Sequence, residues 1–319
     1  MIHALALTGP TASGKTSLSL SLAEVLDCEI ISCDSMQIYK EMDIGTAKAT
    51  EEERRRVPHH LVDFLPVKES YSAEDYRLDA MRAASDIEKR GKLPLFVGGT
   101  GLYIDTLTRA AVPSPPSSIE VRDRLMKEAD NEGCDSLWQR LYEIDPESAL
   151  KTHKNNVRRV VRAIEIYELS GRTKSYFDKL SLSAPRDIDI KMITLDFHNR
   201  ENLYNRVDAR VEIMINEGLL DEVSSLYGRG LLTPDTTASQ AIGYKEFLSY
   251  LRGEVSLEEA KEQLKQSSRR YAKRQLTWFR QKEAYRLYLD TECGEMREFD
   301  DLFSELASAS RSLLSEMVK

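Results

Sequence analysis

Short apolar runs alternate with helical periodicity along roughly the first third of the chain. The runs IHALAL, CEIISC and LPLFV begin at Ile2, Cys28 and Leu93, and each has the length of a buried strand. The segments between them carry apolar side chains at the spacing typical of amphipathic helices. Strands that alternate with helices in this way predict a parallel sheet with helices on both faces.

Capping residues mark two helix starts and one helix end in this region. Thr50 with Glu53, and Ser72 with Asp75, each place a hydroxyl at the N-cap and an acid three positions later. The second of these helices is expected to end just before Gly91, because glycine suits the C′ position.

The pattern changes at the proline-rich stretch VPSPPSS, residues 112–118, which predicts a hinge or linker. From there to about residue 186 the pattern is helical, and the apolar run KMITLDF then predicts a return to the sheet. The remainder of the chain is predicted to be helical. We therefore expect an α/β fold with a parallel sheet in a core of residues 1–112 and 187–319, and an all-helical insertion domain of residues 113–186.

The octapeptide GPTASGKT matches the phosphate-binding pattern G-x-x-x-x-G-K-[ST] in full, and it lies between a predicted strand and a predicted helix. Successive backbone N–H groups at the N-terminus of that helix form a concavity for anions. Lys15 adds a positive charge, and the Thr16 hydroxyl is placed to ligate Mg²⁺. The expected phosphate-binding residues are Gly9, Pro10, Thr11, Ala12, Ser13, Gly14, Lys15 and Thr16.

This P-loop predicts a bound phosphate but does not identify the phosphate compound. An ATPase or GTPase also needs a Walker B acid, and the strand LPLFVGG ends without one. Asp196, far along the chain, is a weak candidate for that role, and the guanine signature N-K-x-D is absent.

Asp34 directly follows the predicted strand CEIISC. We expect it at the carboxyl end of a strand beside the P-loop strand, where ligands of open α/β sheets bind. A general base is the expected role. Turn capping and water-mediated Mg²⁺ binding are the alternatives.

Two further motifs allow a structural and a functional interpretation. The turn GGTG, residues 98–101, ends the third predicted strand, and Thr100 is its only side chain able to hydrogen-bond a ligand. The same turn could simply let a helix pack closely. His59 and His60 suggest a metal pair, but adjacent side chains point apart and no third ligand is spaced nearby. We therefore expect His59 and His60 to serve packing or capping.

The net charge of −8 argues against a chain that coats nucleic acid indiscriminately. Two stretches reverse this charge, since residues 151–174 carry +5 and residues 261–286 carry +7. Basic side chains combined with exposed aromatics suit a single-stranded or looped RNA. The alternative is a solvated basic helix face whose aromatics pack in the core. The aromatics of the second stretch are Tyr271, Trp278, Phe279 and Tyr285.

The four cysteines form no C-x-x-C pair, so neither a zinc site nor a disulfide framework can be built from them. This usage is typical of a reducing compartment, and we expect a cytoplasmic protein. The first apolar run is too short for a signal peptide, and no run of about 18 apolar residues predicts a membrane span. We expect a monomer.

Eight motifs in order make the chain similar to the bacterial tRNA dimethylallyltransferases, also called tRNA isopentenyltransferases. They extend from the first strand to about residue 280, and they are GPTASGKT, DSMQIYKEMDIGTAK, HHLVD, GGTGLY, RRVVRAIEIYELSG, GLLDEV, QAIGYKEF and RQLTWFR. The resemblance implies a P-loop NTPase-like α/β core with a helical insertion. It also implies transfer of a dimethylallyl group from dimethylallyl diphosphate to N6 of adenosine 37, in the anticodon stem-loop of tRNA. The P-loop would then hold the diphosphate leaving group, with Mg²⁺ offsetting its charge.

The resemblance also implies roles at matching positions. Asp34 would be the base on the adenine amine, Thr16 would contact phosphate and Mg²⁺, and Thr100 would lie in a channel near the reacting atoms. An arginine of RVDAR would contact the diphosphate, with Arg210 favoured and Arg206 the rival. The implied tRNA contacts are Asp34, Ser35, Met36, Gln37, Thr100, Arg122, Arg158, Arg159, Val160, Val161 and Arg162, together with GYKEF and RQLTWFR.

Three other functions fit parts of the pattern. Adenylate isopentenyltransferases use free AMP, ADP or ATP as acceptor, but a small acceptor needs neither the two basic stretches nor the insertion. A P-loop small-molecule kinase predicts phosphoryl transfer from ATP. An RNA-binding module with a relic P-loop is disfavoured by the intact Lys15, Thr16 and Asp34.

Overall fold

The computed structural model describes residues 1–110, 112, 115, 117–234 and 236–317. The chain divides into two compact units, a core unit of Met1–Thr108 with Ile188–Lys319 and a helical unit of Arg109–Asp187. Three residues of the predicted hinge VPSPPSS, namely Pro113, Ser114 and Pro116, lie outside the described residues. None of the described helices is long and apolar enough to cross a membrane.

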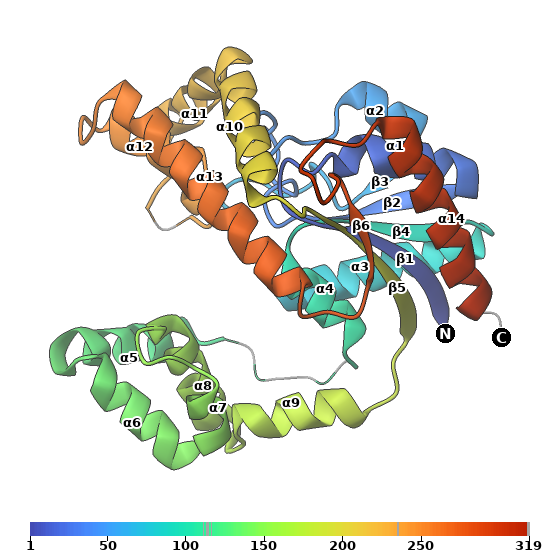
Figure 1. Ribbon diagram of the computed structural model, residues 1–319. Helices are drawn as coiled ribbons and strands as arrows, with labels where there is room; N and C mark the ends of the chain where they lie inside the picture. Colours follow the sequence, from blue (N-terminus) through green and yellow to red (C-terminus); the bar gives the residue numbers. More distant parts are fainter. Residues whose placement is uncertain (111, 113–114, 116, 235, 318–319) are drawn as a thin grey trace. The chain divides into compact units, whose positions relative to one another are not determined.

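The core unit is built on a sheet whose strands follow the order β3-β2-β4-β1-β5-β6, with every neighbouring pair parallel, as predicted (Figure 1). Alternate residues of β1 serve the two faces, because Leu5 and Leu7 pack in one buried cluster while Ala4 and Ala6 pack in another. The strands are β1 (Ile2–Thr8), β2 (Cys28–Cys33), β3 (His59–His60), β4 (Leu93–Gly98), β5 (Ile188–Asp196) and β6 (Tyr285–Tyr288).

Two sequence-based expectations about this sheet are wrong. Strand β2, which leads to Asp34, is not beside the P-loop strand β1, because β4 forms hydrogen bonds with both and lies between them. The C-terminal part was expected to be helical, yet Tyr285–Tyr288 forms β6 at the sheet edge. Strand β6 is only four residues long and, in the described sheet, pairs with β5 alone. So short a segment leaves no clear alternation of apolar and polar side chains in the sequence.

Helices cover both faces of the sheet (Figure 1). Helices α1 and α14 pack on the face of Leu5 and Leu7, and α3 and α4 pack on the face of Ala4 and Ala6. Both predicted capping boxes are present, at the starts of α2 and α3. The core helices are α1 (Lys15–Leu26), α2 (Glu51–Arg56), α3 (Ala73–Lys89), α4 (Gly101–Thr108), α10 (Arg200–Asn216), α11 (Leu219–Gly228), α12 (Tyr244–Leu251), α13 (Leu257–Phe279) and α14 (Phe299–Met317).

A further buried cluster of the core unit joins the loop after β2 to helices α10–α13. Tyr39 and Met42 of the loop pack in it with Val223 of α11, Tyr244 of α12 and Leu264 of α13. The loop that begins at Asp34 is therefore anchored by apolar packing as well as by its strand.

The helical unit has its own apolar core, to which Leu125, Leu141, Val160 and Ile164 contribute. Its described residues form no strand, in agreement with the sequence pattern. Its helices are α5 (Ile119–Glu132), α6 (Cys134–Ile144), α7 (Pro146–Leu150), α8 (Val157–Ser170) and α9 (Lys174–Ser183).

Asp196 ends β5 as one half of an ion pair. Its side chain is 1% exposed, and its two oxygens accept from Arg280 Nε at 3.0 Å and Arg280 Nη2 at 2.7 Å. Asp196, the weak Walker B candidate, is therefore engaged in an ion pair with Arg280. This arginine follows α13 and connects the helix to the end of β5.

Arg280→Ala should destabilise the protein by about 3 kcal/mol, because it leaves the buried Asp196 carboxylate without its main partner. The loss should fall at the low end of the usual range, since Arg286 Nη1 remains 3.9 Å from Asp196. Urea unfolding followed by circular dichroism measures the change. Arg311→Ala, at an exposed position of α14, is the control. Equal free energies of unfolding of the two variants would contradict the role of Arg280 as the main partner of Asp196.

Candidate functional site

The P-loop has the backbone conformation that its glycines allow. Gly14, which caps α1, has φ +81, and a Cβ at Gly9 would lie 2.9 Å from Leu195 Cβ. Lys15 turns back over the loop and donates to Gly9 O at 3.0 Å and Pro10 O at 2.6 Å. Ser13 Oγ is buried and has no hydrogen-bond partner among the described residues. A buried hydroxyl without a partner is costly unless a ligand completes it.

A cavity of about 390 Å³ lies beside this loop in the core unit. Its size is within the range of small-molecule sites. Part of its lining is polar and belongs to the P-loop, the start of the 34–48 loop, and α10. Another part is apolar, with Val211, Met214, Leu219 and Leu264 from the buried cluster of α10–α13. The predicted site residues that line it are Thr11, Ala12, Ser13, Gly14, Lys15, Thr16, Asp34, Ser35, Met36, Gln37 and Arg210.

Asp34 lies in this cavity although β2 is not the neighbour of β1. Its Oδ1 accepts from Met36 N at 2.8 Å and Gln37 N at 3.3 Å. One carboxylate oxygen of Asp34 therefore caps the turn, which was the alternative role considered for this residue. No donor among the described residues bonds to Oδ2. A base on a reacting amine would use this second oxygen, and that role stays a prediction.

Positive charge is concentrated around the P-loop. Burial, together with the positive charge of Arg210, lowers the pKa of Lys15 to about 7, and the negative charge of Asp34 opposes this shift. Burial also lowers the pKa of Arg210 below its ordinary value, again opposed by Asp34. Glu217 opposes the shift of Arg210 as well. Since burial still lowers the pKa of both cations, an added anion would stabilise their charged forms.

The two candidate arginines of α10 have different surroundings. Arg210 lines the cavity. Arg206 instead donates its Nε to Ala12 O at 2.8 Å and is not among the lining residues. The geometry therefore favours Arg210 as the side chain that faces a ligand, while Arg206 supports the P-loop backbone.

The donor set around Thr16 fits Mg²⁺ that is bound together with phosphate. Thr16 has an exposed side chain and lines the same cavity as Asp34 and the buried Ser13 hydroxyl. The described residues contain no group of three or more His, Cys, Asp or Glu side chains that could hold a metal by themselves. Mg²⁺ commonly combines few protein ligands, usually carboxylates, with substrate phosphates and water, so the Thr16 hydroxyl and the Asp34 carboxylate are the candidate ligands here. Binding of Mg²⁺ stays a prediction.

His59 and His60 form the short strand β3 and have structural partners. His59 Nδ1 lies 2.7 Å from Val57 O, and His60 Nε2 lies 2.8 Å from Glu29 Oε2. These contacts agree with the expected packing and capping roles.

The glycines of GGTG serve close packing. A Cβ would lie 2.3 Å from Cys33 O at Gly98, 2.1 Å from Gln275 Nε2 at Gly99, and 2.5 Å from Trp278 at Gly101. Close packing therefore accounts for these glycines, while Gly99 also lines the cavity, so the functional interpretation of the turn stays a prediction.

Thr100 is tied to the loop that carries Asp34. Its Oγ1 accepts from Ser35 N at 3.1 Å, and its own N–H donates to Cys33 O. Thr100 is not among the residues that line the cavity. Its predicted place beside the reacting atoms is untested.

Gln275 of α13 is a residue whose role the sequence did not reveal. Its Oε1 accepts from Thr11 N at 2.8 Å, and its Nε2 donates to Gly99 O at 2.9 Å. It thus joins the P-loop to the end of β4. The only signal was a glutamine inside RQLTWFR, a motif that was assigned as a whole to the tRNA side.

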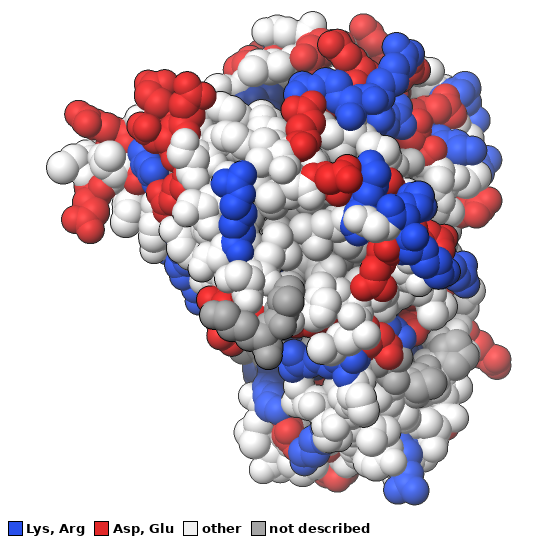
Figure 2. Space-filling model, turned by 90° about the vertical axis from the view of Figure 1, so that its right-hand side faces the viewer, with Lys and Arg blue, Asp and Glu red and all other residues white. Residues whose placement is uncertain are grey.

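Some aromatics of the second basic stretch, residues 261–286, pack in the core, and others are accessible to a ligand. Phe279 is buried in the core and Trp278 packs against it. Tyr271 lines the cavity with Arg274, whose guanidinium carbon lies 5.6 Å from the centroid of the Tyr271 ring. Tyr285 is 39% exposed on β6. On the face shown in Figure 2, Lys and Arg side chains are interspersed with Asp and Glu.

Several predicted tRNA contacts in the helical unit have structural roles. Val160 and Val161 are buried at 1% and 3% exposure in its apolar core, so their side chains serve packing, and a tRNA contact at these two positions stays a prediction. Arg122 and Arg162 both bond to Glu165, whose side chain is fully buried. The carboxylate needs these cations as partners.

Arg158 and Arg159 of α8 are exposed. Arg122 is exposed too, but it is engaged by Glu165, so Arg158 and Arg159 are the exposed predicted contacts that form no ion pair with the described residues. Binding of tRNA by them stays a prediction.

Known proteins resemble this chain in sequence and in fold. The family model for IPP transferase matches residues 37–282, which is more than half of the chain. The chain belongs to the IPP transferase family. The resemblance found in the motifs is thereby confirmed.

Relatives of the family cover nearly the whole chain. It is 45% identical over 281 residues to the tRNA dimethylallyltransferase of Thermoanaerobacter sp. (strain X514). The matched region covers 88% of this chain and 89% of the relative. It is 48% identical over 278 residues to the tRNA dimethylallyltransferase of Bacillus subtilis (strain 168), with 86% and 87% covered.

Solved structures of the family share this fold. The full-length tRNA isopentenylpyrophosphate transferase of Bacillus halodurans has a TM-score of 0.71 and 40% identity, and 99% of this chain and 98% of that one are covered. A eukaryotic dimethylallyltransferase acting on tRNA has a TM-score of 0.77 and 32% identity, with 90% of this chain and 74% of that one covered. The P-loop NTPase-like α/β fold predicted from the sequence is confirmed.

The lowered pKa of Lys15 makes anion binding depend on pH. Below about pH 7 the free protein already carries the ammonium, whereas above pH 7 the amine must first take up a proton to bind a phosphate. The affinity for pyrophosphate with Mg²⁺ should therefore fall, relative to a Lys15→Arg variant, by up to tenfold for each pH unit above about 7.

Calorimetric titrations from pH 6 to pH 9 measure this ratio. The arginine variant keeps its charge throughout, so it shows any pH dependence that comes from pyrophosphate itself. A constant ratio of the two affinities across this range would contradict the shifted pKa of Lys15.

Proposed function

We propose that this member of the IPP transferase family transfers a dimethylallyl group from dimethylallyl diphosphate to N6 of adenosine 37 in tRNA. The observation that carries the proposal is a single cavity that holds the P-loop, Arg210 and Asp34. Its lining supplies cations and N–H groups for a diphosphate, and it also supplies a carboxylate for the acceptor. The names of its relatives, tRNA dimethylallyltransferase and tRNA isopentenylpyrophosphate transferase, support the same reaction.

The diphosphate would bind as the leaving group. The P-loop N–H groups, Lys15 and Arg210 offset the charge that grows on the diphosphate as the bond between C1 and its oxygen breaks. Ser13 Oγ, which has no partner among the described residues, supplies one more donor. When bound, Mg²⁺ held by Thr16 supplies further positive charge to the phosphate oxygens.

The apolar part of the cavity lining suits the five-carbon group. Met214, Leu219 and Leu264 offer no hydrogen-bonding side chain to it. Excluding water there matters, because an allylic carbon with cationic character would otherwise react with water.

Asp34 would receive the proton from the acceptor. The N6 nitrogen attacks C1, the electron pair of the broken bond leaves with the diphosphate, and the N6 proton passes to the Asp34 carboxylate. Holding N6 and C1 close and aligned supplies much of the rate.

The tRNA acceptor requires a surface beyond the cavity. An adenine can leave its stack at low cost in a loop, which suits an anticodon stem-loop better than a duplex. Ser35, Met36 and Gln37 would face the target nucleotide, and the exposed Arg158 and Arg159 would contact the RNA backbone. We further propose that the protein is a cytoplasmic monomer.

Free adenylate is the second acceptor to be tested. The protein is incubated with labelled dimethylallyl diphosphate, Mg²⁺, and either unmodified tRNA or AMP. Label should enter the tRNA and not AMP. Label in AMP would assign the adenylate reaction instead, and ATP turnover without any transfer would overturn the proposal in favour of a kinase.

Asp34→Asn should reduce the transfer rate by about 10²–10⁴, the usual contribution of a general base. Binding of tRNA should change little, because the amide keeps the shape of the side chain and can still accept from Met36 N. Single-turnover transfer and a filter-binding titration measure the two quantities. Asp300→Asn, at an exposed position of α14, is the control. An unaltered transfer rate would remove Asp34 from this role.

A further inference from the structure

The loop of residues 34–48, which follows β2, forms one wall of the cavity. Its first residues line the cavity, including Met36 and Gln37, and so do Gly45, Thr46 and Ala47 near its other end. Most of this loop is neither helix nor strand. Backbone hydrogen bonds tie its middle to residues 63–65, as in Lys40 N to Leu65 O, and side-chain contacts hold the parts that line the cavity.

Gln37 joins the two ends of the loop. Its Nε2 donates to Thr46 O at 3.3 Å and Ala47 O at 3.1 Å, while its Oε1 accepts from Ser32 Oγ at 3.0 Å. The two cavity-lining ends of the loop are therefore bonded to each other.

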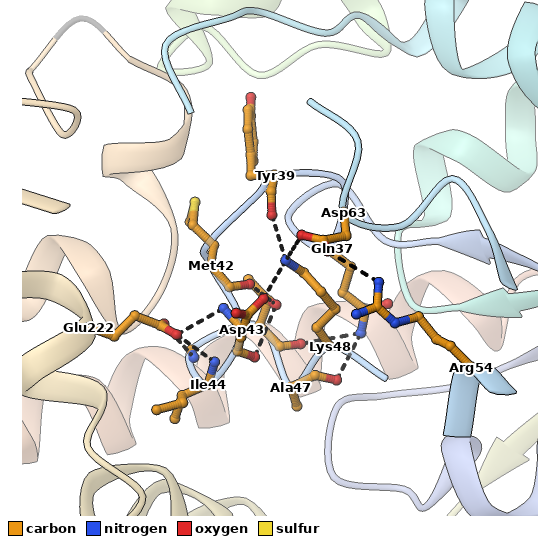
Figure 3. A network of polar contacts seen from close by, with 12 residues as sticks. Gln37, Tyr39, Met42, Asp43, Ile44, Ala47, Lys48, Arg54, Asp63 and Glu222 are labelled. Atoms are coloured by element: carbon orange, nitrogen blue, oxygen red, sulfur yellow. Dashed lines mark hydrogen bonds and ion pairs between the residues drawn. The ribbon is translucent and has the colours of Figure 1, made fainter. Parts of the chain in front are cut away.

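Lys48 holds the middle of the loop. Its side chain is 2% exposed, and its Nζ donates to Tyr39 O at 2.7 Å, Asp43 Oδ1 at 2.5 Å and Asp63 Oδ1 at 2.8 Å (Figure 3). Arg54 is also paired with Asp63. A buried ammonium with three acceptors fixes the internal shape of the loop, but these contacts do not attach it to α11 or α12.

Apolar packing of Tyr39 and Met42 and an exposed ion pair between Glu41 and Arg229 attach the loop to this part of the core unit. Glu222 of α11 adds the hydrogen bonds that hold the cavity-lining end of the loop. Its Oε2 accepts from Asp43 N at 2.9 Å and Ile44 N at 2.8 Å, and its Oε1 accepts from Gly45 N at 3.1 Å (Figure 3). Tyr244 OH of α12 donates to the same oxygen at 2.5 Å. One carboxylate thus receives three successive backbone amides of the loop and one hydroxyl from a third element.

The surroundings of Tyr244 support this arrangement. Burial and the negative charge of Glu222 raise the pKa of Tyr244, so its hydroxyl remains a donor at any working pH. A Cβ at Gly45 would lie 2.4 Å from the Tyr244 ring, so the loop is in close contact with α12. Charge-assisted hydrogen bonds of this kind are among the stronger ones in proteins.

We propose that Glu222 is a positioning residue for the transfer reaction. It fixes the 34–48 loop against α11 and α12, and through the loop it sets where Asp34 and the nucleotide-facing residues stand relative to the diphosphate. Glu222 itself is not among the residues that line the cavity. The inference rests on the proposed function, because it concerns the acceptor side of that reaction.

The test compares four proteins with the wild type. Glu222→Ala removes all four hydrogen bonds. Glu222→Gln keeps an oxygen for Asp43 N and Ile44 N, but its NH₂ group cannot accept from Gly45 N. Tyr244→Phe keeps the three amide bonds. Asp221→Ala removes a charge from the same turn of α11 at an exposed position and is the matched control.

Two quantities are measured for each protein. One is kcat for transfer to tRNA at saturating dimethylallyl diphosphate, expressed per site that binds pyrophosphate in a calorimetric titration. The other is the Kd for pyrophosphate with Mg²⁺. Glu222→Ala should lower kcat by about ten- to a hundredfold, the effect of a displacement of about 1 Å, while Kd stays within about twofold. Glu222→Gln and Tyr244→Phe should retain more activity than Glu222→Ala, and Asp221→Ala should match the wild type.

The outcomes separate the two proposals. A wild-type kcat in Glu222→Ala would overturn the positioning role, and so would an equal loss of kcat and pyrophosphate affinity, which indicates general damage to the fold. If the wild type and Asp221→Ala also fail to modify tRNA while binding pyrophosphate, the proposed function is overturned, and the inference with it.

Discussion

The arrangement of the core unit depends on holding two cations together in one buried site. Burial lowers the pKa of both Lys15 and Arg210, and the negative charges that oppose this are Asp34 for both side chains and Glu217 for Arg210. Such a site persists only if the P-loop backbone is held in place, because the two cations would otherwise move apart. Arg206 bonded to the Ala12 carbonyl and Gln275 bonded to the Thr11 amide provide that restraint.

The sheet supplies the frame, but side chains that bond to backbone groups supply the precision. Thr100 holds Ser35, Gln37 closes its loop on itself, and Glu222 holds three amides of the same loop. Of these contacts, the one made by Glu222 joins the loop to a helix that is fixed by apolar packing, while Gln37 and Thr100 join loop segments to each other. Function is carried by loops on a rigid scaffold, and the polar contacts define how far those loops can move.

Local features of the fold were readable from the sequence because they depend on neighbouring residues. The P-loop, both capping boxes and the helical character of the insertion follow from short patterns. The position of β4 between β1 and β2 does not, since strand order is decided by long-range pairing. Nor could one sequence show that Gln275 bonds to Thr11 or that Glu222 bonds to Gly45. The burial of Val160, Val161 and Ile164 could have been read from their helical spacing, but the motif that contains them was interpreted as a whole.

The bond between Gln275 and Thr11 has a consequence for biosynthesis. The two residues are separated by 264 positions along the chain. At typical elongation rates of 5–20 residues per second, roughly 13 to 53 seconds pass between the appearance of the P-loop and that of its distant partner. Arg206 and Arg210 also emerge long after the P-loop. A nascent chain therefore presents the glycine-rich loop without its restraints, and the anion site is completed among the last steps of folding on the ribosome.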